Sequence, residues 1–185
     1  MKIANSARLS FKKITEQDSE LLYQLDQNPE VMRYLTNGEP SSRSTIEQVF
    51  LPRVQQYSNK EKGWGLWQAV TLDHNEFIGW IIVRPFNFFN EHNDFIRDDS
   101  TLELGWRFKQ SAWGQGYATE AAKAVMNALA KNPKHHYFCA TALTENLASI
   151  NIMKKLGMSF IKNYTHQDQY GLRQASFYQT TTNEP

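Results

Sequence analysis

The sequence predicts a mixed α/β domain that spans residues 1–185. A chain of 185 residues fits one domain, because it can bury roughly 70% of the surface that its unfolded form exposes. Segments rich in aromatic and β-branched residues alternate with segments whose apolar residues recur at helical spacing. In the second half, helices connect strands, and such crossover connections require parallel neighbours. We therefore expect a mixed central sheet of about six or seven strands with helices packed on it.

The first third of the chain predicts a strand followed by helices. Residues 8–14 alternate weakly between apolar and polar, and the capping-box pattern from Thr15 to Asp18 then starts a helix. Asn28-Pro29 starts a short helical segment that Gly38 and Pro40 end, and residues 44–57 form a further helix. Pro52 should kink that helix, because it leaves the carbonyl of Gln48 without its partner.

The middle and the end of the chain predict six strands and two helices. Residues 64–72 and 76–85 form a hairpin across Asp73-His74-Asn75, and the polar stretch 87–99 is a long loop. The helix that starts at Tyr117 carries a continuous apolar face and ends before Asn132-Pro133. The helix over 146–156 is stopped by Gly157. The remaining strands are 102–108, 137–143, 158–164 and 172–180.

Composition excludes several classes of protein. The net charge of +1 provides no broad attraction to nucleic acid or to an anionic membrane, so we expect neither as a direct partner. No apolar run approaches the roughly 20 residues of a membrane span, and residues 1–10 lack a signal-peptide core, which favours a cytoplasmic protein. The single Cys139 cannot form an internal disulfide, and its apolar neighbours indicate a buried strand residue rather than a nucleophile.

A glycine-rich turn between a strand and a helix is the strongest functional signal. In the sequence from Trp113 to Thr119, Gly114 and Gly116 precede a predicted helix. Such a junction offers unpaired backbone N–H groups and the positive end of a helix dipole to an anion. A dinucleotide-binding turn fits less well, because the third glycine of that motif would fall on Thr119. A helix-capping turn without a ligand remains the alternative.

Several segments together resemble the GCN5-related N-acetyltransferase (GNAT) superfamily, and more narrowly its subgroup that acetylates the N-termini of ribosomal proteins. The resemblance is carried by Asn28-Pro29-Glu30-Val31-Met32-Arg33-Tyr34, Glu103-Leu104-Gly105-Trp106-Arg107, Trp113 to Ala122, Asn146-Leu147-Ala148-Ser149 and Lys155-Leu156-Gly157-Met158. The family's pyrophosphate motif maps onto Trp113, Gly116 and Ala118, with Trp113 departing from the usual Gln or Arg. The resemblance implies acetyl-CoA as cosubstrate, two central parallel strands that splay apart, and suggests a homodimer.

The resemblance also implies where acetyl-CoA binds. The backbone of Gly114, Gln115, Gly116, Tyr117, Ala118 and Thr119 would hold the pyrophosphate. The backbone of Trp106, Arg107 and Phe108 would pair with the pantetheine arm as an added strand does. Asn146 and Ser149, one helical turn apart, would lie near the sulfur on the other side. Asn146 is also a plausible helix cap, and Ser149 a small packing residue.

Acetyl transfer to an amine requires an unprotonated nucleophile and a proton for the leaving thiolate. The resemblance makes Glu103 the candidate base, although it can also be read as an exposed strand carboxylate. The family's usual tyrosine acid would fall on Met153, so Ser149 becomes the candidate proton donor or sulfur-orienting group. Reference pKa values favour an α-amine over a lysine side chain as acceptor, with polyamines, aminoglycosides, amino-acid-like amines and a non-catalytic acyl-CoA-binding module left open.

The acceptor pocket should be formed by the early helices, the 87–99 loop and the last strands. Acidic residues of that loop would attract a cationic substrate or would simply be solvated; they are Glu91, Asp94, Asp98 and Asp99. A metal site is not expected, because His135 and His136 are adjacent and point apart on any regular element, and no carboxylate cluster accompanies them.

Overall fold

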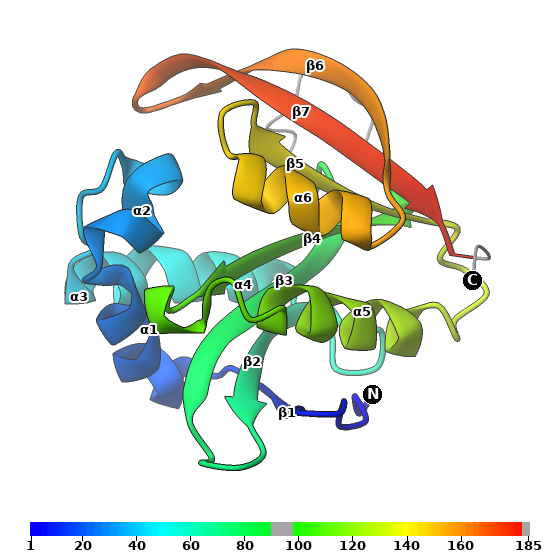
Figure 1. Cartoon of the computed structure of the whole chain (residues 1–185), viewed down its shortest axis with the longest axis horizontal. Helices are drawn as coiled ribbons and strands as arrows, with labels where there is room; N and C mark the ends of the chain where they lie inside the picture. Colours follow the sequence, from blue (N-terminus) through cyan, green and yellow to red (C-terminus); the bar gives the residue numbers. More distant parts are fainter. Residues whose placement is uncertain (90–97, 183–185) are drawn as a thin grey trace.

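The computed structural model describes residues 1–89 and 98–182, whose strands form one mixed sheet with the order β1-β2-β3-β4-β5-β7-β6 (Figure 1). The predicted α/β class is confirmed. The sheet has seven strands, at the upper end of the expected range. Their bounds are Leu9–Lys13 (β1), Gly65–Thr71 (β2), Phe77–Phe86 (β3), Asp98–Phe108 (β4), Tyr137–Leu143 (β5), Ser159–Asp168 (β6) and Gly171–Thr181 (β7).

The centre of the sheet contains its only parallel pair in the described chain, β4 with β5. That pairing runs through three residue pairs and ends at Glu103↔Cys139. Beyond it, β4 continues to Phe108 paired only with β3, and β5 continues to Leu143 paired only with β7. The two central strands therefore splay apart, as the resemblance implied.

Two helices pack on one face of the sheet. Helix α5 (Tyr117–Leu129) buries Ala121, Ala122 and Val125 in the same core as Ile81 and Val83 of β3. Helix α6 (Leu147–Lys155) adds its apolar side to that core. Both helices lie in front of the sheet in Figure 1. The alanines let α5 approach the strands closely, which fixes the start of α5 beside the end of β4.

The opposite face is covered by the early helices. These are η1 (Glu16–Asp18), α1 (Ser19–Asp26), α2 (Pro29–Thr36), α3 (Arg43–Thr45), η2 (Ile46–Phe50) and α4 (Leu51–Tyr57). Leu22, Ile46 and Val54 pack there against Leu66 and Trp80. Because alternate residues of a strand face opposite sides of the sheet, Trp80 packs in the core under the early helices and Ile81 in the core under α5.

The helix around Pro52 contains an irregularity that the sequence did not predict. The residues before the proline, Ile46–Phe50, form a π-helical segment, and the Leu51 N–H donates to the Ile46 carbonyl five residues back. A π-helical turn shifts the hydrogen-bonding register ahead of the proline, whose missing N–H then falls in the first turn of α4, where it costs little.

The predicted loop over 87–99 needs a correction at its end. Asp98 and Asp99 belong to β4, and Asp98 accepts hydrogen bonds from Ser100 and Thr101. Glu91 and Asp94 lie outside the described residues. In the described part of the chain, no helix is both long and apolar enough to cross a membrane.

Candidate active site

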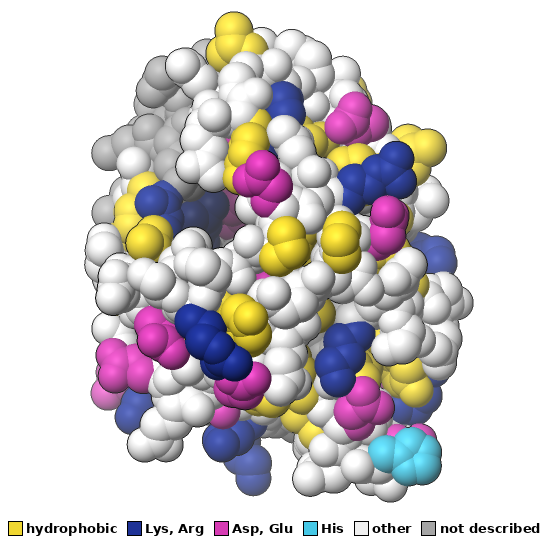
Figure 2. Space-filling view, turned by 90° about the vertical axis from the view of Figure 1, so that its left-hand side faces the viewer, with side chains coloured by type: hydrophobic (Ala, Val, Ile, Leu, Met, Phe, Trp, Pro, Cys, Tyr) yellow, Lys and Arg dark blue, Asp and Glu magenta, His cyan; other side chains and the backbone are white. Residues whose placement is uncertain are grey.

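A cavity of about 780 Å³ lies where β4 and β5 part. Its walls come from the ends of these strands, the glycine turn, the starts of α5 and α6, helix α2, and the β6–β7 hairpin. Figure 2 views the molecule from the side on which α2 lies, where basic and acidic side chains are interspersed and no patch of one sign dominates. The separation of β4 from β5 beyond Glu103, called the parting below, thus creates one continuous space between elements far apart in sequence.

The glycine turn forms one end of this cavity. Gly114 (φ 74°) and Gly116 (φ 80°) both adopt the left-handed conformation that favours glycine, and Gly116 is the residue before α5. The turn is anchored, because the Trp113 indole donates to the Phe108 carbonyl at 2.9 Å and Arg8 Nη2 donates to the Gln115 carbonyl at 3.1 Å. The first N–H groups of α5, which have no intrahelical acceptor, therefore sit at a fixed place on the cavity wall.

An ion pair that the sequence did not indicate supports this turn. Arg8 and Glu120 are 2.7 Å apart, and the Ser6 hydroxyl donates to the same carboxylate. Burial alone would raise the pKa of Glu120, but the hydrogen bonds from Ser6 and Arg8 outweigh it and the pKa is lowered. Glu120 therefore stays ionised and holds the first turn of α5 against the N-terminal segment.

The free edge of β4 forms a second wall. Trp106 and Phe108 both line the cavity, and Phe108 is almost fully buried because it also packs in the core beneath α5. The Arg107 guanidinium is directed elsewhere, donating to the buried carboxylate of Asp26 on α1 and lying 4.9 Å from the centre of the Trp80 ring. The backbone of residues 104–108 pairs with no described strand on the β5 side, and the Phe108 carbonyl accepts from the Trp113 indole instead. The Arg107 charge serves the contact with α1.

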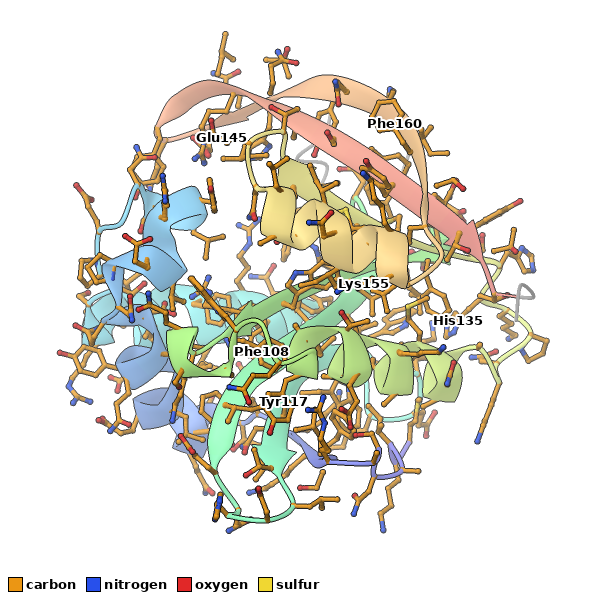
Figure 3. The ribbon with its side chains drawn as sticks, viewed as in Figure 1. Phe108, Tyr117, His135, Glu145, Lys155 and Phe160 are labelled. Atoms are coloured by element: carbon orange, nitrogen blue, oxygen red, sulfur yellow. The ribbon has the colours of Figure 1, made fainter. Side chains whose placement is uncertain are left out.

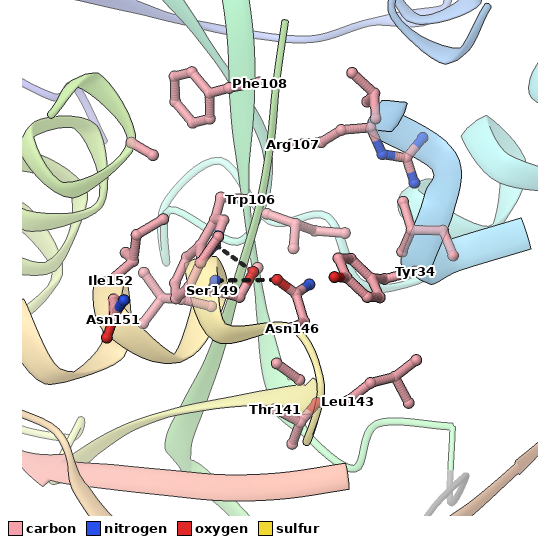
Figure 4. A pocket seen from close by; sticks show the side chains of 18 of the residues that line it. Tyr34, Trp106, Arg107, Phe108, Thr141, Leu143, Asn146, Ser149, Asn151 and Ile152 are labelled. Atoms are coloured by element: carbon pink, nitrogen blue, oxygen red, sulfur yellow. Dashed lines mark hydrogen bonds between the residues drawn. The ribbon is translucent and has the colours of Figure 1, made fainter. Parts of the chain in front are cut away.

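The start of α6 faces this edge. The Asn146 side-chain oxygen accepts from the Ser149 N–H at 3.1 Å, so the alternative of a helix cap is confirmed for Asn146. Ser149 is more than a packing residue, because its hydroxyl accepts from the Trp106 indole at 3.3 Å. Figure 4 shows Trp106, Ser149 and Asn146 in one line across the cavity. Met153 points the other way and is fully buried in the core.

Glu103 lies at the point where the strands part. It is 7% exposed and its carboxylate accepts from Arg84 Nε at 2.8 Å, so the reading of an exposed strand carboxylate is wrong. The neighbouring Cys139 is fully buried; burial raises the pKa of its thiol well above the usual value, and the charge of Glu103 adds to this rise. Cys139 is therefore an inert strand residue, as predicted.

The far end of the cavity contains polar side chains that sequence reasoning missed. Tyr164 on β6 lines it, and burial raises the pKa of that tyrosine to about 12 although a hydrogen bond with the Thr141 side chain opposes the rise. At the β6–β7 hairpin, Asp168 pairs with Arg173, and His166 Nε2 lies 3.6 Å from the Asp168 carboxylate. No sequence motif marks these residues, because only the antiparallel pairing of β6 with β7 brings them together.

Several predicted site residues lie together and one lies apart. Gly114, Gly116, Tyr117, Ala118, Thr119, Asn146 and Ser149 all line the cavity with Glu103 and residues 106–108. Gln115 is exposed and its amide donates to the Ser111 carbonyl at 2.8 Å. Lys155, near the end of α6, adds a basic group to the wall on the side toward α5 (Figure 3). Among residues 1–89 and 98–182, no group of three or more His, Cys, Asp or Glu side chains has a metal-binding arrangement.

Comparison with known proteins shows which protein family this chain belongs to. Residues 8–159 match the family model described as Acetyltransferase (GNAT) domain. The protein YkkB of Bacillus subtilis is 30% identical over 84% of this chain and 84% of its own length. The FsC-acetyl coenzyme A-N(2)-transacetylase of Aspergillus fumigatus is 28% identical over 86% of this chain, which spans 66% of that longer protein. The chain therefore belongs to the GNAT acetyltransferase family.

Solved structures agree on the fold. A GNAT-family acetyltransferase from Bacillus anthracis superposes with a TM-score of 0.77 at 24% identity over both full chains. RimL, a ribosomal L7/L12 alpha-N-protein acetyltransferase in complex with coenzyme A, has a TM-score of 0.75 at 16% identity over 98% of each chain. The aminoglycoside acetyltransferase AAC(6')-Ib, also with coenzyme A, has the same TM-score and identity over 94% of each chain. Membership of the GNAT family makes this chain an acetyl-CoA-dependent N-acetyltransferase, and its fold alone does not distinguish acceptors.

Proposed function

We propose that this enzyme transfers the acetyl group of acetyl-CoA to an α-amine, most favourably the N-terminus of a protein of the ribosomal type. The observation that carries the proposal is the parting of β4 and β5 directly beside an anchored glycine turn. That arrangement supplies a place for a long thioester between an anion-binding helix end and a buried carboxylate.

On the cosubstrate side, the pyrophosphate is held by the backbone N–H groups of residues 114–119, and Lys155 adds a positive charge. The left-handed glycines let the backbone approach the phosphates without a Cβ in the way: a Cβ on Gly114 would meet no atom within 4 Å. The pantetheine arm pairs with the free edge of residues 106–108. Asn146 and Ser149 meet it from α6.

On the acceptor side, Glu103 accepts the proton of the amine, directly or through a water molecule, and a backbone N–H of Trp106 or Phe108 polarises the acetyl carbonyl. Ser149 orients the sulfur or donates to it. The ion pair with Arg84 keeps Glu103 fixed at the bottom of the parting. Catalysis in this scheme depends mainly on orientation of the amine against the thioester.

Charge at the acceptor end favours a singly charged amine over a polycation. Arg33, Arg84 and Arg173 there are balanced by Glu30, Glu103 and Asp168. A polyamine or an aminoglycoside needs a surplus of acidic groups, which these described residues do not provide. The pKa also matters: freeing a lysine amine at neutral pH costs roughly 4 to 5 kcal/mol, whereas an α-amine costs only about 1 to 1.4 kcal/mol.

A small-molecule α-amine is the second candidate, because the Aspergillus relative is named for transfer to an N(2) nitrogen. The test is acetyl-CoA turnover by the parent enzyme on four acceptor classes: N-terminal peptides, amino-acid amides, polyamines and aminoglycosides. We expect the highest kcat/KM on peptides. A preference for amino-acid amides would select the second candidate, and a preference for polycations would refute the α-amine proposal. Binding of acetyl-CoA without turnover on any acceptor would indicate a non-catalytic module.

A further inference from the structure

Tyr34 of α2 reaches across the cavity toward the start of α6. It lines the cavity together with Asn146 and Ser149. Figure 4 shows its hydroxyl directed toward the Asn146 side chain, next to the line formed by Ser149 and Trp106. Asn146 uses its oxygen for the helix cap, so the side of the amide that faces Tyr34 is not occupied by that hydrogen bond. A phenol hydroxyl thus stands opposite the helix end that borders the parting.

The structure holds this tyrosine in place from three directions. Its ring packs against a core cluster that includes Leu143 and Tyr164. The Arg33 guanidinium lies 5.5 Å from the centre of the ring. The Tyr34 carbonyl accepts from Arg173 Nη1 at 3.4 Å, and Arg173 is itself paired with Asp168. The hydroxyl is therefore presented by a fixed wall that joins α2 to the β6–β7 hairpin.

The chemistry leaves a role for such a hydroxyl. A leaving thiolate needs a proton, and Met153 supplies none because it is an apolar residue of the buried core. Ser149 can donate a hydrogen bond, but an aliphatic hydroxyl is a much weaker acid than a phenol. The two hydroxyls thus suit different tasks, with Ser149 orienting the sulfur and the phenol releasing a proton.

We propose that Tyr34 is the catalytic acid that protonates the leaving thiolate of coenzyme A, a role that rests on the acetyl transfer proposed above. The amine nitrogen forms a bond to the acetyl carbon, and the carbon–sulfur bond then breaks. The sulfur takes the proton from Tyr34 Oη. The proton lost by the amine leaves through Glu103, and the phenolate regains a proton from cavity water, so no net proton is consumed by the enzyme.

The test compares Tyr34→Phe with the parent on the best acceptor of the panel. Phenylalanine keeps the ring and its packing. We expect kcat to fall about 100-fold, a typical loss for a missing general acid, while KM for acetyl-CoA changes less than about twofold. The matched control is Tyr23→Phe, because Tyr23 lies on α1 with its ring against Arg43 and does not line the cavity. That control should retain the parent kcat.

A second substrate separates proton donation from positioning. Acetyl-seleno-CoA releases a selenolate that needs no proton, so the difference in kcat between parent and Tyr34→Phe should shrink to less than about threefold. A loss that persists with the selenoester would assign Tyr34 to positioning and overturn its role as acid. Equal kcat of parent and variant with acetyl-CoA would also overturn it. A parent that turns over no acceptor would refute the proposed function itself.

Discussion

The ion pair between Arg84 and Glu103 allows a prediction about both stability and catalysis. Arg84 Nε and Glu103 Oε2 are 2.8 Å apart, and the two side chains are only 17% and 9% exposed. Removing one partner of a buried pair leaves an uncompensated charge and costs about 3 to 5 kcal/mol. We therefore expect Arg84→Met to lower the free energy of unfolding by that amount. Glu103→Gln keeps an acceptor oxygen for the arginine and should cost about 2 kcal/mol, the value of a hydrogen bond to a charged group.

A double-mutant cycle isolates the interaction. In Arg84→Met/Glu103→Gln no buried charge is left alone, so the combined loss should fall short of the sum of the single losses by about 2 kcal/mol. Urea unfolding followed by tryptophan fluorescence measures each free energy, and the five tryptophans provide the signal. Strict additivity, or single losses below about 0.5 kcal/mol, would refute the claim that this pair fixes the parting.

The same variants examine the chemical role of Glu103. Acetyl transfer should fall about 100-fold in Glu103→Gln, and it should not recover in the double variant, because a base is missing in both. An activity in Glu103→Gln within threefold of the parent would exclude Glu103 as the base and leave it a structural partner of Arg84.

Two further predictions follow from perturbed pKa values. Burial, and then the charge of Lys60, lower the pKa of Lys13 to about 8. Below pH 8 the folded protein therefore carries a poorly solvated charge on Lys13. Between pH 8 and the ordinary value of 10.5, the folded protein loses this proton while the unfolded chain keeps it. Lys13→Met should therefore be more stable than the parent at pH 7 by about 1 kcal/mol after allowance for screening, with a smaller gain at pH 10; equal gains in urea midpoints at both values would contradict this. Because burial raises the pKa of Cys139, its reaction with Ellman's reagent at pH 8 should be at least about 100-fold slower in the native protein than in urea; one rapidly reacting thiol in the native protein would show that β5 is accessible.

The sequence predicted those parts of the fold that depend on local pattern. Residues 137–143 form a strand with the predicted bounds, and the helix after Gly116 begins at Tyr117 as expected. The π-helical segment before Pro52 was not predicted, because how a helix accommodates a proline depends on what the surrounding helices pack against. Local pattern sets element type, whereas packing decides how an irregularity is absorbed.

The same distinction between local pattern and long-range packing explains which residues of the cavity the sequence predicted. The glycine turn, Asn146, Ser149 and Glu103 were predicted as site residues because they belong to short contiguous motifs, and all of them border the cavity. Arg84, Tyr34 and the His166, Asp168 and Arg173 cluster were missed, because each becomes part of the cavity only through pairing with a distant segment. The sequence also could not predict where the Arg107 side chain points, since its partner Asp26 lies 81 positions away.

The two ends of the cavity are built from different parts of the chain. The end proposed to bind acetyl-CoA is built from backbone, namely the amides of one helix end and the free edge of one strand, which many side chains can accompany. The end proposed to bind the acceptor is built from side chains on α2, β3 and the β6–β7 hairpin, joined by Arg84 to Glu103 and by Arg173 to Asp168 and to the Tyr34 carbonyl. RimL and AAC(6')-Ib match the fold equally well although their names give different acceptors. If the proposed assignment of the two ends is right, acceptor choice resides in these side chains, and a substitution at Arg173 should alter the ranking of acceptors while leaving the affinity for acetyl-CoA unchanged.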